Sequence, residues 1–198
     1  MRRVGEAVVL RVGAFVAVAL TAVWALAGAA QAQGATAPGS SRRCRGALTL
    51  PTRSNLALID SAATCLIDRE RAHYRLPALQ PNPDLHGIAT SLAGEMARAG
   101  FFGDDSVAGQ TPWQRIAEST YAVGAQVVAV AQNIGWGTGG LATPQGVVEE
   151  WMRSTPHRLI ILSGGYSDFG VGAAPIAPSS LTHEKPGATY TVEFAARE

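Results

Sequence analysis

The sequence predicts one α+β domain, with helices in its first half and strands closing its second half. Apolar residues follow the helical i, i+3, i+4 spacing over residues 55–75 and 83–100. By contrast, residues 169–176 and 189–196 are short apolar runs with the composition of strands. Helices and strands that are separated along the chain are typical of α+β folds and not of repeated βαβ units.

The two early helices have recognisable ends. The helix predicted over residues 55–75 stops at Leu76-Pro77, because proline cannot continue a helix. The helix over residues 83–100 opens with a first-turn proline, and Gly100 takes the position of a C-cap. Both helices have one apolar face.

Two shorter helices are expected later in the chain. Thr111 and Thr143 each precede a proline, which is the pattern of an N-cap followed by a first helical residue. They predict helices over residues 112–121 and from residue 144 onward. Between them, residues 126–136 are apolar enough for a buried strand, and the glycine-rich residues 137–140 are expected to end it.

The first 32 residues have the features of a secretory leader. Arg2 and Arg3 precede an apolar run over residues 12–30, and Ala30-Gln31-Ala32 is a small-x-small cleavage pattern. The alternative is a retained anchor, because about 19 apolar residues can span a bilayer. The domain is therefore expected outside the cytoplasm, secreted or in the cell envelope, with membrane attachment only through an uncleaved leader.

The next segment, residues 33–47, is interpreted as a flexible linker because it is rich in small and polar residues. The folded domain is expected over residues 48–198. The two cysteines, Cys44 and Cys65, are most simply a disulfide in an oxidising compartment. Free or metal-binding thiols are the weaker alternative, because no CxxC motif or nearby histidine completes a metal site.

Charge excludes one class of partner. The chain has 16 basic and 15 acidic residues, and its only basic cluster beyond the expected leader is Arg42, Arg43 and Arg45. Nucleic-acid binding depends on many clustered lysine and arginine side chains that neutralise phosphates. Nucleic acid is therefore not an expected partner.

Seven short motifs occur in a fixed order over residues 56–196: LIDRER, MARAGFF, GQTPW, QNI, VVEEWM, STPHR and FGVG. In this order and spacing they resemble a bacterial CAP domain, of the superfamily of cysteine-rich secretory proteins, antigen 5 and plant pathogenesis-related proteins. The resemblance implies a three-layer α-β-α sandwich with a cleft on one side.

In relatives, this cleft holds two histidines and acidic residues, which in some members bind a divalent metal such as zinc. The resemblance places His157 at the second histidine position. It places Asp104 where the first histidine is usual and Gln132 where a glutamate is usual, with Asn133 beside it. The implied ligand-binding cleft therefore consists of Asp104, Gln132, Asn133 and His157.

These departures weaken the chemistry of the cleft. Glutamine takes up no proton, and its amide is a poor metal ligand. One imidazole, one carboxylate and one amide make a poor zinc site, so no metal or other cofactor is expected. Asp104 can still act as a base.

Each candidate also has a structural interpretation. Asp104 lies in a polar loop, and Gln132 could brace the sheet with its amide. His157 follows a proline in the first turn of a helix, a common place for a structural histidine. Trp113 and Trp151 are expected in the core, in preference to a ligand-binding surface.

Residues 135–140 satisfy the GxGxxG pattern of dinucleotide-binding proteins. The following helix, however, begins beyond the last glycine, so its N-terminus would not meet a pyrophosphate. No acidic residue stands at the required distance on a following strand. Dinucleotide binding is therefore rejected.

The sequence leaves two main functional hypotheses, with a structural role in the cell envelope as a third. The first is a non-catalytic domain that binds a small molecule, lipid or peptide through the cleft. The alternative is an extracellular hydrolase, such as a peptidase or amidase, in which Asp104 and His157 form an acid/base pair.

Overall fold

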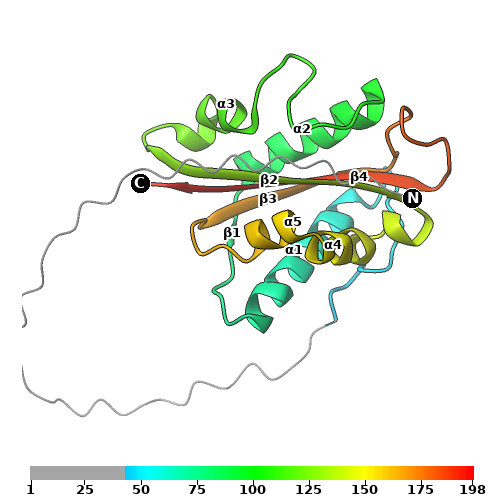
Figure 1. Ribbon diagram of the computed structural model, residues 1–198, viewed down its shortest axis with the longest axis horizontal. Coiled ribbons are helices and arrows are strands. Elements are labelled where there is room, and N and C mark those ends of the chain that lie inside the picture. Colours follow the sequence, from blue (N-terminus) through cyan, green and yellow to red (C-terminus); the bar gives the residue numbers. More distant parts are fainter. Residues whose placement is uncertain (1–42) are drawn as a thin grey trace, which may run out of the picture.

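Helices cover both faces of a four-stranded sheet in the computed structural model, which describes residues 43–198 (Figure 1). In chain order the elements are α1 Leu56–His73, β1 Gln80–Pro81, α2 Pro83–Ala99, α3 Pro112–Ala117, η1 Thr120–Ala122, β2 Val127–Thr138, η2 Gly139–Ala142, α4 Pro144–Arg153, α5 Thr155–Ile161, β3 Asp168–Ala174 and β4 Gly187–Arg197. The expected leader, residues 1–32, lies outside the described residues. None of the helices in residues 43–198 combines the length and apolar character that crossing a bilayer requires.

The strands are arranged in the order β1-β3-β4-β2. The central strand β4 is antiparallel to both neighbours, and the two-residue β1 is parallel to β3. Helices α2 and α3 lie on one face of the sheet, and α1, α4 and α5 lie on the other (Figure 1). The α+β class and the three-layer α-β-α arrangement are therefore confirmed.

Helix α2 packs unusually close to the sheet because β3 has glycines where the helix crosses it. A Cβ on Gly170 would lie 2.1 Å from the backbone nitrogen of His86, and one on Gly172 would lie 2.2 Å from that of Thr90. Both clashes are with helix backbone, which cannot move aside as a flexible side chain can. The FGVG motif thus sets the distance between α2 and the sheet.

The two other glycines of interest, Gly135 and Gly137, lie within β2. A Cβ on Gly135 would lie 2.7 Å from a methyl carbon of Val147 in α4, and one on Gly137 would lie 2.5 Å from the carbonyl oxygen of Leu141. The GxGxxG pattern therefore serves packing. Contrary to the expected break at residues 137–140, the strand continues through Thr138, because Gly137 and Thr138 still pair with β4.

The two candidate core tryptophans have different environments. Trp151 is 2% exposed, and its indole nitrogen donates to the carbonyl oxygen of Ile134 at 2.9 Å. Trp113 is 42% exposed, so its assignment to the core is wrong. Helix α3 has only six residues and buries Ile116, which leaves Trp113 in its first turn outside the core. The expected helix over residues 112–121 is interrupted, and Ser119 caps the separate turn η1.

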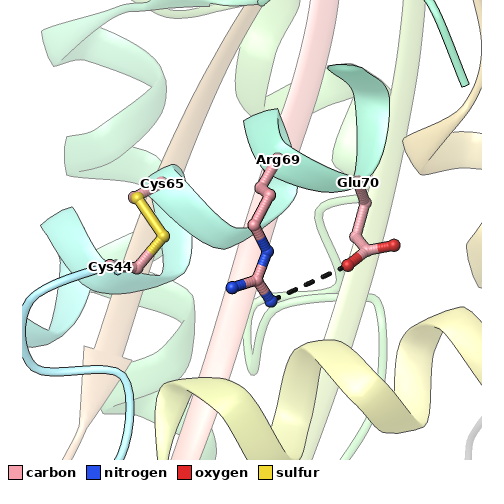
Figure 2. The surroundings of a disulfide bond; sticks show 4 residues. All are labelled: Cys44, Cys65, Arg69 and Glu70. Carbon is pink, nitrogen blue, oxygen red and sulfur yellow. Dashed lines mark ion pairs between the residues drawn. A yellow bond between two sulfur atoms is a disulfide. The ribbon is translucent and has the colours of Figure 1, made fainter. Parts of the chain in front are cut away.

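The start of the described chain is fixed to α1 by a disulfide. Cys44 and Cys65 are bonded, as predicted, and Figure 2 shows the bond beside the Arg69–Glu70 ion pair. The adjoining turn also contacts α4, since the carbonyl oxygen of Ala47 accepts from the backbone nitrogen of Gln145 at 2.9 Å. The folded domain therefore begins slightly before residue 48.

The close approach of α2 gives a matched pair of substitutions. Gly172→Ala forces the helix and sheet apart and should lower the free energy of unfolding by about 2–3 kcal/mol. Gly87→Ala, on the same helix, meets nothing within 4 Å and should raise it by about 0.5–1 kcal/mol. Urea denaturation of both variants measures the contrast. Equal stability of the two variants would contradict this explanation of the FGVG motif.

Removing the disulfide should destabilise the domain, because the unfolded chain gains conformational entropy. The cysteines are 21 residues apart, and opening a loop of this length costs about 3 kcal/mol. The double variant Cys44→Ser, Cys65→Ser should therefore unfold at lower denaturant concentration than the oxidised wild type. Reduced wild-type protein is the control and should match the double variant. If oxidised and reduced protein unfold together, the disulfide adds nothing to stability.

Candidate functional site

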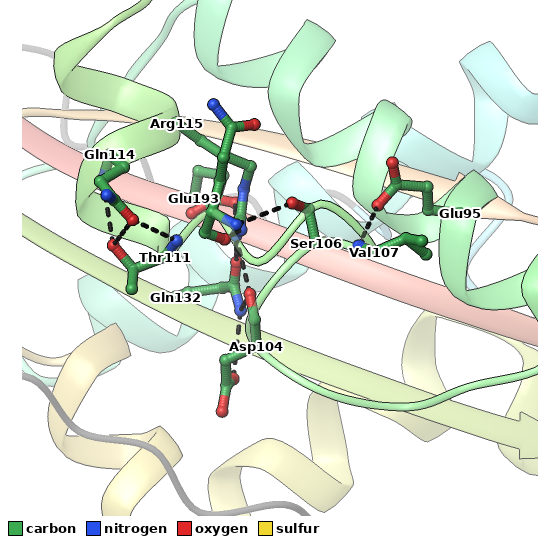
Figure 3. A network of polar contacts seen from close by, with 10 residues as sticks. Glu95, Asp104, Ser106, Val107, Thr111, Gln114, Arg115, Gln132 and Glu193 are labelled. Carbon is green, nitrogen blue, oxygen red and sulfur yellow. Dashed lines mark hydrogen bonds and ion pairs between the residues drawn. The ribbon is translucent and has the colours of Figure 1, made fainter.

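The loop of residues 101–110 connects α2 to α3 and contains Asp104 (Figure 3). Its tip is attached to α2, because the backbone nitrogen of Val107 donates to a Glu95 carboxylate oxygen at 3.2 Å. After the loop, the Thr111 hydroxyl accepts from the third residue of α3 and caps that helix, as the sequence predicted. The loop is thus anchored to the helix on each side of it.

Arg115, in α3, contacts the loop through its guanidinium group. Its Nη1 donates to the carbonyl oxygen of Gln110 at 2.6 Å, and its Nη2 donates to the carbonyl oxygen of Asp104 at 2.9 Å. The Arg115 side chain is only 9% exposed. A nearly buried guanidinium therefore holds the loop by two of its backbone carbonyls.

The same guanidinium reaches two neighbouring strands. Gln132 on β2 and Glu193 on β4 are directly paired in the sheet. Arg115 Nη2 donates to Gln132 Oε1 at 2.5 Å and lies 3.4 Å from Glu193 Oε1. Gln132 Nε2 in turn donates to Asp104 Oδ1 at 3.1 Å. We call these four residues the Arg115 cluster (Figure 3).

Burial changes the acidity of both carboxyl groups in the cluster. Glu193 is 0% exposed, and loss of solvation raises its pKa to about 7 despite the opposing charge of Arg115. The pKa of Asp104 is also raised, first by burial and further by the charge of Asp105, while the hydrogen bond from Gln132 and the charge of Arg115 lower it. Both carboxyl groups therefore hold a proton more readily than in water.

Gln132 and Asn133 point to opposite faces of the sheet, because adjacent residues of a strand alternate. Gln132 contacts the loop and α3 on one face. Asn133 is buried and donates from Nδ2 to the carbonyl oxygen of His157 on the other face, at 3.2 Å. The structure therefore assigns the two residues to different neighbours, although the resemblance placed them side by side in one cleft.

His157 is buried near the start of α5. Its Nδ1 lies 2.7 Å from the Ser154 hydroxyl, the residue that precedes the helix. Asp104 Oδ1 accepts from Gln132, and the carbonyl oxygen of Asp104 accepts from Arg115. That these residues line a common ligand-binding cleft stays a prediction.

The Arg115 cluster does not suit the divalent metal that the resemblance implies for some relatives. Among residues 43–198, no three histidine, cysteine, aspartate or glutamate side chains are grouped as metal ligands. The oxygen of Gln132 that could bind a metal already accepts from Arg115, and Asp104 Oδ1 accepts from Gln132. A guanidinium at this point repels a second cation.

Two shallow hollows lie elsewhere, beside α1 and α4. One of about 190 Å³ lies between these helices over Leu66, Val148 and Met152. The other, of about 310 Å³, borders the turn at Cys44. Neither hollow is lined by the residues of the expected cleft.

Two members of the cluster, Arg115 and Glu193, were missed by the sequence analysis. Glu193 had a signal, since it is the only charged residue in the apolar run over residues 189–196. A charge in a buried strand requires a partner. No feature of the sequence indicated Arg115, because an arginine in a short amphipathic helix is expected to face solvent.

Replacing Glu193 should alter how stability depends on pH. Its pKa rises from 4.5 to about 7 on folding. Between these values the native state keeps a proton that the unfolded chain releases, so stability falls as pH rises from about 4.5 to 7. Glu193→Gln removes this loss and should be more stable than wild type at pH 8, by at most about 3 kcal/mol.

At pH 5 the Glu193→Gln variant and wild type should be nearly equal, because Gln resembles protonated Glu. Thermal unfolding between pH 5 and 8 measures the difference. Glu150→Gln, on the exposed surface of α4, is the control for the substitution itself. If Glu193→Gln is less stable than wild type at pH 8, the ionised Glu193 does not destabilise the native state as proposed.

Comparisons with known proteins agree with the fold. The chain matches the family model described as the cysteine-rich secretory protein family, CAP, over residues 65–185. An outer surface protein from Borrelia burgdorferi is similar, with a TM-score of 0.55 and 18% identity over 68% of this chain and 90% of that one. No curated protein matches in sequence.

Two further solved structures each correspond to this chain over 40% of their own length. An extracellular protein with an SCP domain from Bacillus anthracis has a TM-score of 0.53 and 20% identity over 72% of this chain. A cysteine-rich secretory protein from Staphylococcus aureus has a TM-score of 0.52 and 19% identity over 73% of it. At these identities the likeness shows the fold alone. Because the family model spans more than half of the chain, the chain belongs to the cysteine-rich secretory protein (CAP) family.

Proposed function

We propose that this CAP domain is a non-catalytic binding or recognition module that acts outside the cytoplasm. The observation that carries the proposal is the double engagement of Gln132, whose amide donates to Asp104 and accepts from Arg115. Asp104 is thereby fixed in a brace between loop and sheet. A general base needs a carboxylate that can take a proton from a substrate, and a bracing carboxylate is poorly suited to this role.

The extracytoplasmic location rests on three kinds of support. The sequence begins with the pattern of a secretory leader. Two similar proteins are described as an outer surface protein and as an extracellular protein. The disulfide between Cys44 and Cys65 fits an oxidising compartment.

The ligand is proposed to be an amphipathic small molecule, lipid or peptide segment. The segment that contains Asp104 also exposes two large apolar side chains, Val107 at 65% and Trp113 at 42%. Exposed aromatic side chains offer a large contact area with a polar end. Polar and apolar groups on one loop-to-helix segment suit such a ligand.

Binding and turnover should be measured together on lipid vesicles, a peptide library and cell-wall fragments. We expect saturable binding to one of these probes that Trp113→Ala weakens about tenfold, because truncated tryptophans often dominate binding energy. Leu159→Ala, which removes an exposed side chain from α5, is the matched control and should leave affinity unchanged. Equal affinities of the two variants would place the binding surface elsewhere.

The alternative, a hydrolase that uses Asp104 and His157, is favoured by the raised pKa of Asp104. It requires turnover that Asp104→Asn and His157→Gln each abolish while the variants stay folded. We expect no turnover by the wild-type protein on the peptide library and cell-wall fragments. Turnover that disappears in both folded variants would replace the proposed function with this one.

A further inference from the structure

Two buried atoms in the Arg115 cluster lack hydrogen-bond partners. They are Nε of Arg115 and Oε2 of Glu193. The adjacent atoms, Arg115 Nη2 and Glu193 Oε1, lie 3.4 Å apart. In a two-bond arginine–carboxylate fork, Nε and Nη2 each donate to one carboxylate oxygen. The unpartnered atoms are therefore the pair that would complete such a fork.

The fork is incomplete because Nη2 is held elsewhere. It lies 2.5 Å from Gln132 Oε1 and 2.9 Å from the carbonyl oxygen of Asp104, both shorter than its distance to Glu193. Hydrogen bonds from a guanidinium to an ionised carboxylate are usually about 2.7–2.9 Å long. The longer contact suits a neutral Glu193, with Arg115 held toward the loop.

We propose that Arg115 acts as a two-position clasp, which either holds the 101–110 loop by its carbonyls or forms a two-bond fork with ionised Glu193 and loosens the loop. Both positions use the same guanidinium, so strengthening one weakens the other. The sheet provides a fixed end, because Glu193 is on the central strand β4. The loop is the end that moves.

The ionisation of Glu193 sets which position is preferred, and its pKa of about 7 lies where modest changes in pH matter. Two charges act on this carboxyl group, Arg115 from α3 and Asp104 from the loop. Helix α2 covers the same face near Gly170, the β3 partner of Glu193. The titratable group of α2 at this point, His86, contacts the carbonyl oxygen of Val171 through Nδ1.

Loosening the loop would free both the Asp104 carboxylate and the Gln132 amide that it covers. The domain would therefore be closed at mildly acidic pH and more open above neutral pH. The movement itself does not depend on what the domain binds. Only its consequence, access to Asp104 and Gln132, rests on the proposed function.

Amide hydrogen exchange of the 104–110 segment tests the clasp. Raising the pH from 6 to 8 takes a group with a pKa near 7 from about 10% to about 90% ionised. After correction for intrinsic exchange rates, protection of this segment in the wild type should fall about tenfold relative to Glu193→Gln. For segments of β2 and β4, the ratio of wild-type protection to Glu193→Gln protection should not change with pH.

A second variant separates the clasp from general loosening. Arg115→Lys has a single ammonium group that cannot form the fork, so its 104–110 segment should be weakly protected at both pH values. The proposal is overturned if protection of the 104–110 segment in the wild type, relative to that in Glu193→Gln, stays constant or rises with pH. In that case, comparison of the 104–110 segment with β4 within the wild-type protein should also show no pH-dependent change.

The outcome is distinguishable from that of the binding experiments. If protection falls with pH but no vesicle, peptide or cell-wall fragment binds, the clasp stands and the proposed function fails. If binding occurs and protection does not change, the clasp fails alone.

Discussion

The arrangement of the candidate site depends on the hydrogen bonds and the ion pair that the Arg115 guanidinium makes. It is almost buried and contacts three parts of the chain: the 101–110 loop, Gln132 on β2 and Glu193 on β4. Without it, the loop carbonyls would have to find other donors, and Glu193 would be a buried carboxylate without a counter-charge. The loop, the edge strand and the central strand are thus positioned relative to one another by one side chain.

This arrangement changes the interpretation of the residues that distinguish this chain from the usual CAP pattern. Gln132 stands where the resemblance expects an acid, yet a buried carboxyl group is present on the adjoining strand, at Glu193. The cluster therefore contains a buried acidic group, which lies beside Arg115. The two-residue alternation of β2 directs Asn133 to the other layer, where it supports α5 through the carbonyl oxygen of His157. Residues that are adjacent in sequence thus serve different layers.

The close packing of the sheet determines how strongly this buried polar cluster is desolvated. Gly170 and Gly172 let α2 lie directly against β3, and Gly135 makes room for α4 on the opposite face. Close packing on both faces excludes water from the centre of β4. Burial raises the pKa of Glu193, and Gly170, its partner on β3, contributes to that burial by letting α2 approach the sheet.

The α+β class, most helix starts and the disulfide could be predicted from the sequence, because these features depend on local signals. A cap such as Thr111, a proline, a C-cap glycine or an even pair of cysteines acts within a few residues or through a simple pairing rule. The resemblance further supplied the three layers. Trp113 was assigned wrongly because a six-residue helix has too little apolar periodicity to define its buried face.

The contacts between polar groups, by contrast, depend on how distant parts of the chain pack together. Arg115 and Glu193 are 78 residues apart, and no local pattern predicts a contact over that separation. The pairing register of β2 with β4 places Gln132 beside Glu193, and the short α3 brings Arg115 over both. A buried charge can be suspected from sequence, but its partner depends on strand register and helix placement, which are properties of the whole fold.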